Sequence, residues 1–179
     1  MDISGSIELD DGFNIELKFL QTMLHGLNFN FGYTRVGYVT FYSNATSRVF
    51  LDTYISEFAK RDLLHAVTID RVGHQTNISS GLEEALMNQF VSINGDRIGV
   101  DNVLILLSDG HLTIETPENA LQMASNVKQG GIDIYSVAIG PGPNSGLLLD
   151  IGGSSDHYIA VPTASDVAER ANDLLDLLC

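Results

Sequence analysis

Five side chains with hard oxygen atoms stand in three short segments that could bind one metal ion. The first segment, Asp2-Ile3-Ser4-Gly5-Ser6, sets a carboxylate and two hydroxyls at alternate positions beside a glycine. Thr76 lies in a second polar segment, and Asp109 follows a run of apolar residues. Oxygen ligands of this kind suit Mg²⁺, Mn²⁺ or Ca²⁺. Taken alone, the first segment is equally well explained as a helix start that Ser4 or Ser6 caps.

The segments that must position these residues alternate between predicted strands and helices. Apolar residues at three- and four-residue steps predict a first helix that begins downstream of Ser6 and ends at Gly26. Residues 103–107 are almost continuously apolar, which is typical of a strand buried on both faces. Further strands are expected at residues 35–42, 49–51, 132–139 and 157–161, and further helices at residues 60–67, 79–90, 117–129, 147–151 and 165–178.

This order of elements predicts a doubly wound α/β domain, with a mostly parallel sheet, helices on both faces and one antiparallel edge strand. Ligands of such sheets bind where the carboxyl ends of the strands meet. Residues 2–6 and Thr76 each precede a helix, and Asp109 follows the most buried strand. We therefore expect all three segments at one edge, where five oxygen donors with room for water suit octahedral Mg²⁺ or Mn²⁺.

The length, net charge and apolar content of the chain limit the class of protein to which it can belong. The 179 residues fit one domain. The net charge of -14 opposes nonspecific binding to nucleic acid or anionic lipid, and it favours cations or basic partners. A well-solvated acidic surface explains that charge equally well. The sequence lacks an apolar run of about 20 residues and the pattern of a signal peptide, so no membrane insertion is expected.

With these residues placed, the chain resembles the von Willebrand factor type A family. The metal-ion-dependent adhesion site of that family consists of D-x-S-x-S, a threonine in a separate loop and an aspartate in a D-G turn. The matching residues here are Asp2, Ser4, Ser6, Thr76 and Asp109. Other landmarks follow in the family's order over nearly the whole chain, at residues 34–37, 75–78, 108–110 and 131–140.

The resemblance implies a function and a location. Asp2, Ser4 and Ser6 would reach the metal, while Thr76 and Asp109 would bind it directly or through water. An exposed Asp or Glu of a matrix or cell-surface partner, such as a collagen, would complete the shell of an extracellular, secreted adhesion domain. The alternative is a structural module of an extracellular matrix or biomineral assembly with an idle metal site. The third alternative is that the chain is an intracellular member of the family.

The chain departs from the family before its first metal ligand. The family's first strand is a buried apolar run that ends just before the first aspartate, and here only Met1 stands in that place. We expect a single domain over residues 1–179 that is truncated before this strand, rather than a domain left with a gap in its core, because one truncation explains both the lost strand and the single cysteine. Cys179, the single cysteine, cannot form an internal disulfide, so it is a free thiol or half of a bridge to another segment. The resemblance favours the bridge, because secreted members often pair a cysteine at this place with one upstream.

Several single residues carry secondary expectations. Asn44 in the predicted hairpin fits an N-glycosylation sequon, and Asn77 fits a second one that lies against the expected metal site. His74 and His111 are expected to be solvated loop residues, since a hard oxygen site has little use for imidazole. The residues expected in the core include Phe19, Met23, Phe31 and Tyr135.

An enzymatic function is not expected from the motifs. The sequence contains no glycine-rich or P-loop phosphate motif and no G-x-S-x-G nucleophile elbow. A metal-dependent phosphohydrolase could use Asp2 and Asp109, but no catalytic base and no basic phosphate clamp accompany them. We therefore predict no catalytic residues.

Overall fold

The computed structural model describes residues 1–7, 11–67, 73 and 75–178. The helices are α1 (Gly12–Gly26), α2 (Lys60–Ala66), α3 (Ile78–Glu84), α4 (Pro117–Gln129), α5 (Ser145–Gly152) and α6 (Val167–Leu178). The strands are β1 (Tyr38–Phe41), β2 (Ala45–Val49), β3 (Asn102–Ser108), β4 (Ile132–Ile139) and β5 (Tyr158–Val161). Shorter helical turns include η2 (Asn30–Gly32), η3 (Glu57–Ala59) and the π-helical turn η4 (Ala85–Gln89), which continues α3.

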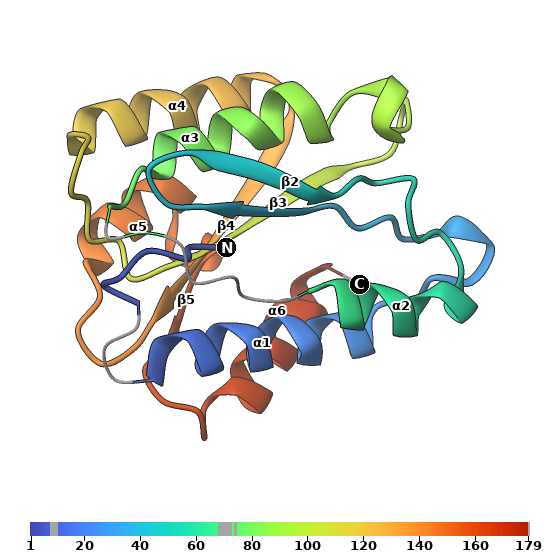
Figure 1. The fold of residues 1–179 in the computed structure, drawn as a ribbon, viewed down its shortest axis with the longest axis horizontal. Coiled ribbons are helices and arrows are strands. Elements are labelled where there is room, and N and C mark those ends of the chain that lie inside the picture. The colour runs from blue at the N-terminus through green and yellow to red at the C-terminus, as the bar shows by residue number, and fades with distance from the viewer. Residues whose placement is uncertain (8–10, 68–72, 74, 179) are drawn as a thin grey trace.

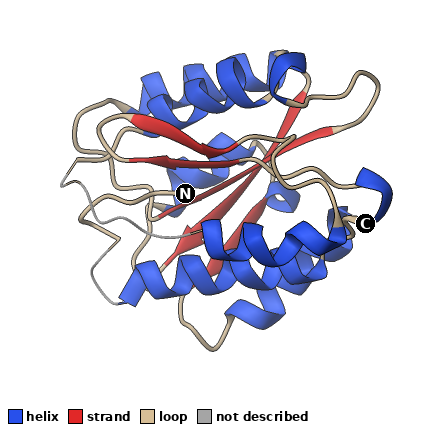
Figure 2. Cartoon of the chain, turned by 45° about the vertical axis from the view of Figure 1, so that its right-hand side comes forward, coloured by secondary structure: helices blue, strands red, loops and turns tan. Residues whose placement is uncertain are grey.

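Two layers of helices enclose a central layer of strands (Figures 1 and 2). Strands β3, β4 and β5 form a parallel sheet, and β1 pairs antiparallel with β2. Helices α3 and α4 lie on one side of the strands with α5, while α1 and α6 pack together on the other side near α2. The predicted doubly wound α/β fold with an antiparallel edge strand is confirmed. None of the described helices is long and apolar enough to span a membrane.

The core confirms most of the expected residues and corrects one. Phe19 and Met23 are buried, and Tyr135 is half-buried against the same cluster. Phe31 was predicted to be buried, but it is 98% exposed. Turn η2 explains the difference, because Gly32 N donates to the carbonyl of Phe29 and the chain reverses there. Phe29 is therefore the ring that enters the core, and Phe31 points out with a positive φ of 53°.

The hairpin is shorter and placed earlier than the sequence indicated. We expected a loop over residues 43–47 and a second strand over 49–51, whereas β2 already begins at Ala45. The amide of Tyr42 donates to the carbonyl of Asn44 at 3.0 Å, which closes a tight turn and pairs Phe41 with Ala45. Along β2, exposed residues alternate with residues that are half-buried or buried, because only one face of this edge strand packs on the core.

The first residues of the chain join the two groups of strands. Asp2 N donates to the carbonyl of Leu107 in β3, and Ile3 N donates to the carbonyl of Phe41 in β1. Residues 1–3 thus lie between β1 and β3, with an isolated parallel bridge between Asp2 and Phe41. Beyond Met1 the two strands border a cavity of about 400 Å³.

Candidate metal site

The three predicted segments meet at the end of the molecule where α1, α3 and α4 begin, on the left in Figure 1. Asp2 lies against the end of β3, and Ser4 forms a parallel bridge with Gly73. The amide of Thr76 donates to Thr113 Oγ1 at 2.6 Å, and Thr113 N donates back to the Thr76 carbonyl. These bonds tie the Thr76 loop to the loop that follows Asp109.

Asp2 is fully buried and held by two bonds. Its Oδ1 accepts from Ser4 N at 2.9 Å, and its Oδ2 accepts from Ser108 Oγ at 2.7 Å. Burial raises the pKa of the Asp2 carboxyl to about 6, and the charge of Asp109 adds to this, although the bonds from Ser108 and Ser4 oppose it. Because burial disfavours the charged form of the Asp2 carboxyl, a cation bound beside it would stabilise that charge strongly.

Ser4 and Ser6 face one another, with 3.0 Å between their Oγ atoms. Ser4 is completely buried and Ser6 is half-buried. Helix α1 begins only at Gly12, and Asp11 occupies its N-cap position without a capping bond from its side chain to the helix backbone. Neither serine therefore caps this helix, which removes the competing interpretation of the D-x-S-x-S segment.

Thr76 supplies the most informative single atom of the site. Its hydroxyl oxygen is buried and has no hydrogen-bond partner among the described residues. The next residue, Asn77, caps α3 by accepting from Ser80 N at 3.0 Å, which fixes the backbone around Thr76. Buried hydroxyls without a partner are costly, so this atom fits the role of a metal or water ligand.

Asp109 stands where β3 ends. Its Oδ1 accepts from His111 N at 2.9 Å, and its carbonyl accepts from Asn144 N at 2.7 Å. Gly110 takes a φ of +73°, so a side chain would strain this turn. The amide of Gly110 donates to Ser108 Oγ at 2.9 Å, and this hydroxyl in turn binds Asp2. Ser108 thus ties the Asp2 carboxylate to the turn that carries Asp109.

Glu16, in α1, is an acidic residue near the site that the sequence analysis did not single out. It is fully buried, and neither carboxylate oxygen has a hydrogen-bond partner in the described part of the chain. Burial and the charges of Asp2 and Asp109 hold the pKa of Glu16 well above its usual range. The available signal was its spacing of three residues from both Phe13 and Phe19, which places it on the apolar stripe.

The donor set fits a hard divalent cation. It offers two carboxylates and three hydroxyls, and the described residues contain no group of three His, Cys, Asp or Glu side chains that could hold a metal. Softer ions, which prefer thiolate or imidazole ligands, would therefore bind weakly to this donor set. His111 is exposed, and its Nε2 lies 2.9 Å from the Gly142 carbonyl, as expected for a loop residue. His74 and Cys179 lie outside the described residues.

A family model of the von Willebrand factor type A domain matches residues 1–173. The chain belongs to this family. Human collagen alpha-6(VI) chain is 26% identical over the whole of this von Willebrand factor type A chain, and the mouse protein is equally similar. The alignment covers only 8% of the length of these collagen chains.

Solved structures support the same fold. Proximal thread matrix protein 1 from the mussel byssus matches all of this chain, which covers 46% of that protein, with a TM-score of 0.87 and 21% identity. A further structure of the byssus protein has a zinc-occupied MIDAS motif. Manganese-loaded TRAP protein from Plasmodium vivax matches 94% of this chain, which covers 68% of that structure, with a TM-score of 0.78 and 21% identity.

Proposed function

We propose that this von Willebrand factor type A domain binds a protein partner through a divalent cation. The ligands are Asp2, Ser4, Ser6, Thr76 and Asp109. The observation that supports this most strongly is the buried Thr76 hydroxyl, which lacks a partner in the described chain and belongs to a loop tied to the one after Asp109. Mg²⁺ and Mn²⁺ are the proposed ions, and the same oxygen donors also accept Ca²⁺.

The protein would position the cation with five ligands and leave a place in its octahedral shell open for a ligand from the partner. Asp2 and Asp109 bring two negative charges, and the three hydroxyl ligands are neutral. A bound cation supplies a Lewis acid that an incoming Asp or Glu of the partner can coordinate. Ser108 and the backbone amides of Ser4 and His111 orient the two carboxylates and leave the hydroxyl ligands available.

The proposed partner is an extracellular matrix protein, such as a collagen, that exposes an acidic side chain. The likeness to a collagen chain and to a byssus matrix protein supports this choice and a secreted, extracellular location. In that setting Asn44, which is exposed in the hairpin turn, is the proposed glycosylation site. Asn77 is poorly suited, because its Oδ1 and Nδ2 already bond to Ser80 and Ser43. Cys179 would pair with a cysteine of another segment.

The test is binding to immobilised collagens and acidic matrix proteins. We expect binding in Mg²⁺ or Mn²⁺, its loss in EDTA, and its loss on Asp109→Ala. Asp133→Ala, an exposed position on β4, is the matched control and should bind as the native domain does. Full affinity in EDTA would sink the proposal. Binding indifferent to Asp109→Ala would instead favour a structural matrix module with an idle metal site.

A further inference from the structure

We infer that the surface formed by turns η2 and η3 binds a flexible basic segment of a partner protein. Three apolar side chains, Phe31, Ile55 and Phe58, are exposed on this surface, and we call them the aromatic patch. The two turns lie at the right-hand end of the molecule in Figure 1, away from the proposed metal ligands. None of the three side chains lines the cavity beside β3. Binding at the patch does not depend on a metal ion, so it is a second site.

The two rings of the patch remain almost entirely in water. Phe31 is 98% exposed and Phe58 is 96% exposed, and Ile55 is exposed in the segment that leads to η3. Aromatic side chains in folded proteins usually bury a large part of their surface. Single exposed apolar residues are common, but several that gather on adjoining turns are typical of a surface that another molecule covers.

The backbone at Phe31 is strained in the conformation that exposes its ring. Its φ of 53° lies in the left-handed region, which aromatic residues rarely adopt and which glycine or asparagine adopts more easily. The ring is supported by Tyr33, whose ring meets it edge-on at 6.4 Å between centroids. The fold gains no buried ring from Phe31 in return for this strain. Such strain is typical of residues that have a function.

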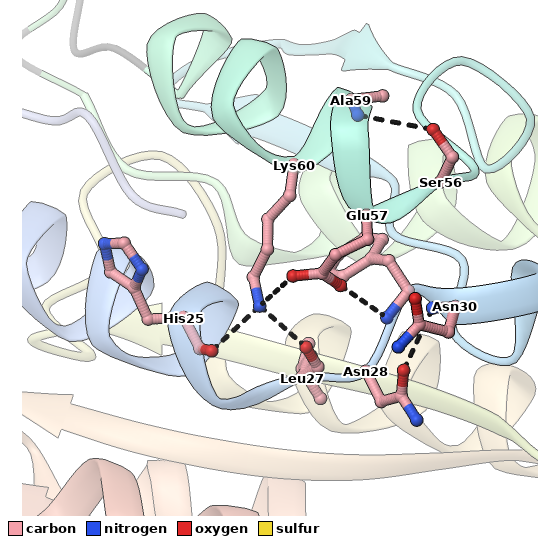
Figure 3. Close-up of polar contacts among 9 residues, drawn as sticks. His25, Leu27, Asn28, Asn30, Ser56, Glu57, Ala59 and Lys60 are labelled. Carbon is pink, nitrogen blue, oxygen red and sulfur yellow. Dashed lines mark hydrogen bonds and ion pairs between the residues drawn. The ribbon is translucent and has the colours of Figure 1, made fainter.

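The two turns are joined by side-chain bonds, as Figure 3 shows. Lys60 Nζ donates to the carbonyls of His25 and Leu27 at 2.8 and 2.9 Å. Glu57 Oε1 pairs with Lys60 Nζ at 3.3 Å, and Glu57 Oε2 accepts from the amide of Phe29 at 3.3 Å. The segment that leads into η2 is therefore bound to η3 and to the start of α2.

A second set of contacts fixes the far side of η2. Arg97 donates to the carbonyls of Gly32 and Tyr33 at 2.6 and 2.8 Å. Gly32 also lies close to the segment before η3, since a Cβ at this glycine would be 3.9 Å from the carbonyl oxygen of Ile55. The aromatic patch is thus ordered before a partner binds, which lowers the entropic cost of association.

The charges that surround the patch are mostly negative. Asp52, Glu57 and Asp62 are exposed carboxylates in the segment that carries Ile55 and Phe58. The exposed cation of residues 52–62 is Arg61, whose Nε lies 3.7 Å from Asp62 Oδ1. The half-buried Lys60 and Arg97 direct their donors to backbone carbonyls. Together with the net charge of -14, this arrangement attracts a basic partner.

Arginine and lysine side chains complement both parts of this surface. Their charged groups stack on the faces of aromatic rings and pair with carboxylates, and their aliphatic stems cover apolar surface. The same contact already occurs inside this region, where Lys60 Nζ lies 5.5 Å from the centroid of the Phe29 ring. The exposed rings of Phe31 and Phe58 have no such cation among the described residues.

The shape and charge of the surface favour a flexible protein segment over other partners. Rings that are exposed on nearly all sides can be enclosed by a chain that adapts to them, and disordered basic segments bind in this way. The carboxylates beside the rings oppose anionic lipid, which attracts basic rather than acidic surfaces. A second copy of the chain carries the same net charge of -14, which opposes association at this surface.

The test titrates the full 179-residue chain, in EDTA and at physiological salt, into a fluorescein-labelled peptide, Arg-Leu-Arg-Gly-Leu-Arg-Leu-Arg. We expect the anisotropy to show saturable binding of one peptide per chain. A second peptide carries citrulline in place of every arginine, which keeps the size of the side chain and removes its charge. It should bind at least about fivefold more weakly. No saturable binding, or equal affinity of the two peptides, would overturn the proposal.

Removal of the two rings separates the aromatic patch from general attraction to an acidic protein. The double variant Phe31→Gly with Phe58→Ser keeps the net charge and should weaken peptide binding at least about fivefold. The control is Met87→Ser with Leu177→Ser, which removes two exposed apolar side chains elsewhere and should bind as the native chain does. Unchanged affinity in the ring variant would contradict the assignment.

A pair of variants with equal net charge tests the carboxylates. Asp52→Asn with Asp62→Asn should weaken peptide binding by at least about threefold, because both carboxylates adjoin the patch. Asp133→Asn with Asp156→Asn removes the same number of negative charges at exposed positions of β4 and η6. This control should have a smaller effect. Equal effects of the two pairs would show that affinity follows net charge alone and would overturn the site.

Amide chemical shifts of the isotope-labelled chain locate the bound peptide. We expect the largest shift changes within residues 29–33 and 55–62. Changes that exclude these residues would place the peptide elsewhere and refute the proposal, even if the affinities follow the variants as described.

The other two partners are tested with the same ring variant. Cosedimentation with vesicles of phosphatidylcholine and phosphatidylserine measures binding to a membrane, and analytical ultracentrifugation measures association between copies. We expect neither for the native chain. Vesicle binding or a dimer that is lost in Phe31→Gly with Phe58→Ser would assign the patch to a membrane or to a second copy, and the proposal of a basic protein segment would be wrong.

Discussion

At the scale of single residues, Glu16 combines complete burial with two carboxylate oxygens that have no partner among the described residues. An ionised carboxylate in such surroundings is destabilising unless it is paired. We expect Glu16→Leu to raise the free energy of unfolding at pH 8 by about 1–4 kcal/mol. Chemical denaturation in EDTA measures this, with the exposed Glu169→Leu as control. A loss of stability would show that the Glu16 carboxylate has a stabilising partner.

Asp2 makes the stability of the metal-free domain depend on pH. The pKa of its carboxyl is raised by burial from 3.8 to about 6, so the native state holds a proton that the unfolded chain has released between these values. Stability contributed by this proton is present below pH 3.8 and is lost as the pH rises through about 6. Relative to Asp2→Asn, the native protein in EDTA should lose up to about 3 kcal/mol between pH 4 and 6.5. Parallel curves for the two proteins would contradict this assignment.

The same proton competes with the metal, so the sign is reversed for binding. As the pH falls below about 6, the Asp2 carboxyl becomes protonated and the affinity for Mn²⁺ should fall. Calorimetric titrations at pH 5.5 and 7.5 measure the difference. An affinity that does not change between these values would mean that Asp2 does not ligate the ion.

At the scale of elements, turn η2 separates a buried ring from an exposed one. Phe29 is completely buried, so Phe29→Ala should lower the free energy of unfolding by about 3–5 kcal/mol. Phe31 is exposed and has a positive φ, which aromatic residues rarely adopt. Phe31→Gly should therefore leave stability unchanged or raise it by up to about 1 kcal/mol. Thermal unfolding measures the stability of both variants. Similar changes in stability for Phe29→Ala and Phe31→Gly would contradict the turn geometry.

Strands buried on both faces left the clearest signal in the sequence. Residues 103–107 and 132–139 were predicted well because strands buried on both faces leave continuous apolar runs. The hairpin was misplaced because β2 is an edge strand whose polar residues resemble a loop. Phe31 was misassigned because its burial depends on the turn η2, which periodicity does not fix, and Glu16 was overlooked because a carboxylate on an apolar stripe runs against the usual burial of residue types.

At the scale of the whole molecule, the proposed metal site and the cavity lie at opposite ends of residues 1–3. The motif alone predicted all five proposed ligands, since D-x-S-x-S, Thr76 and Asp109 must meet where parallel strands end. Long-range geometry was needed for the rest. The buried Thr76 hydroxyl without a partner among the described residues, the bond from Ser108 to Asp2 and the cavity beside β3 all involve segments far apart in the sequence.

The most direct test of the proposed function is a calorimetric titration of Mn²⁺ into the native domain, Thr76→Val and Asp109→Ala. We predict one ion per native domain. Thr76→Val, which keeps the shape of the side chain and removes the hydroxyl, should weaken binding, and Asp109→Ala should abolish it. The control Asp133→Ala should match the native domain. Equal affinity for Mn²⁺ in all four proteins would contradict the proposed site.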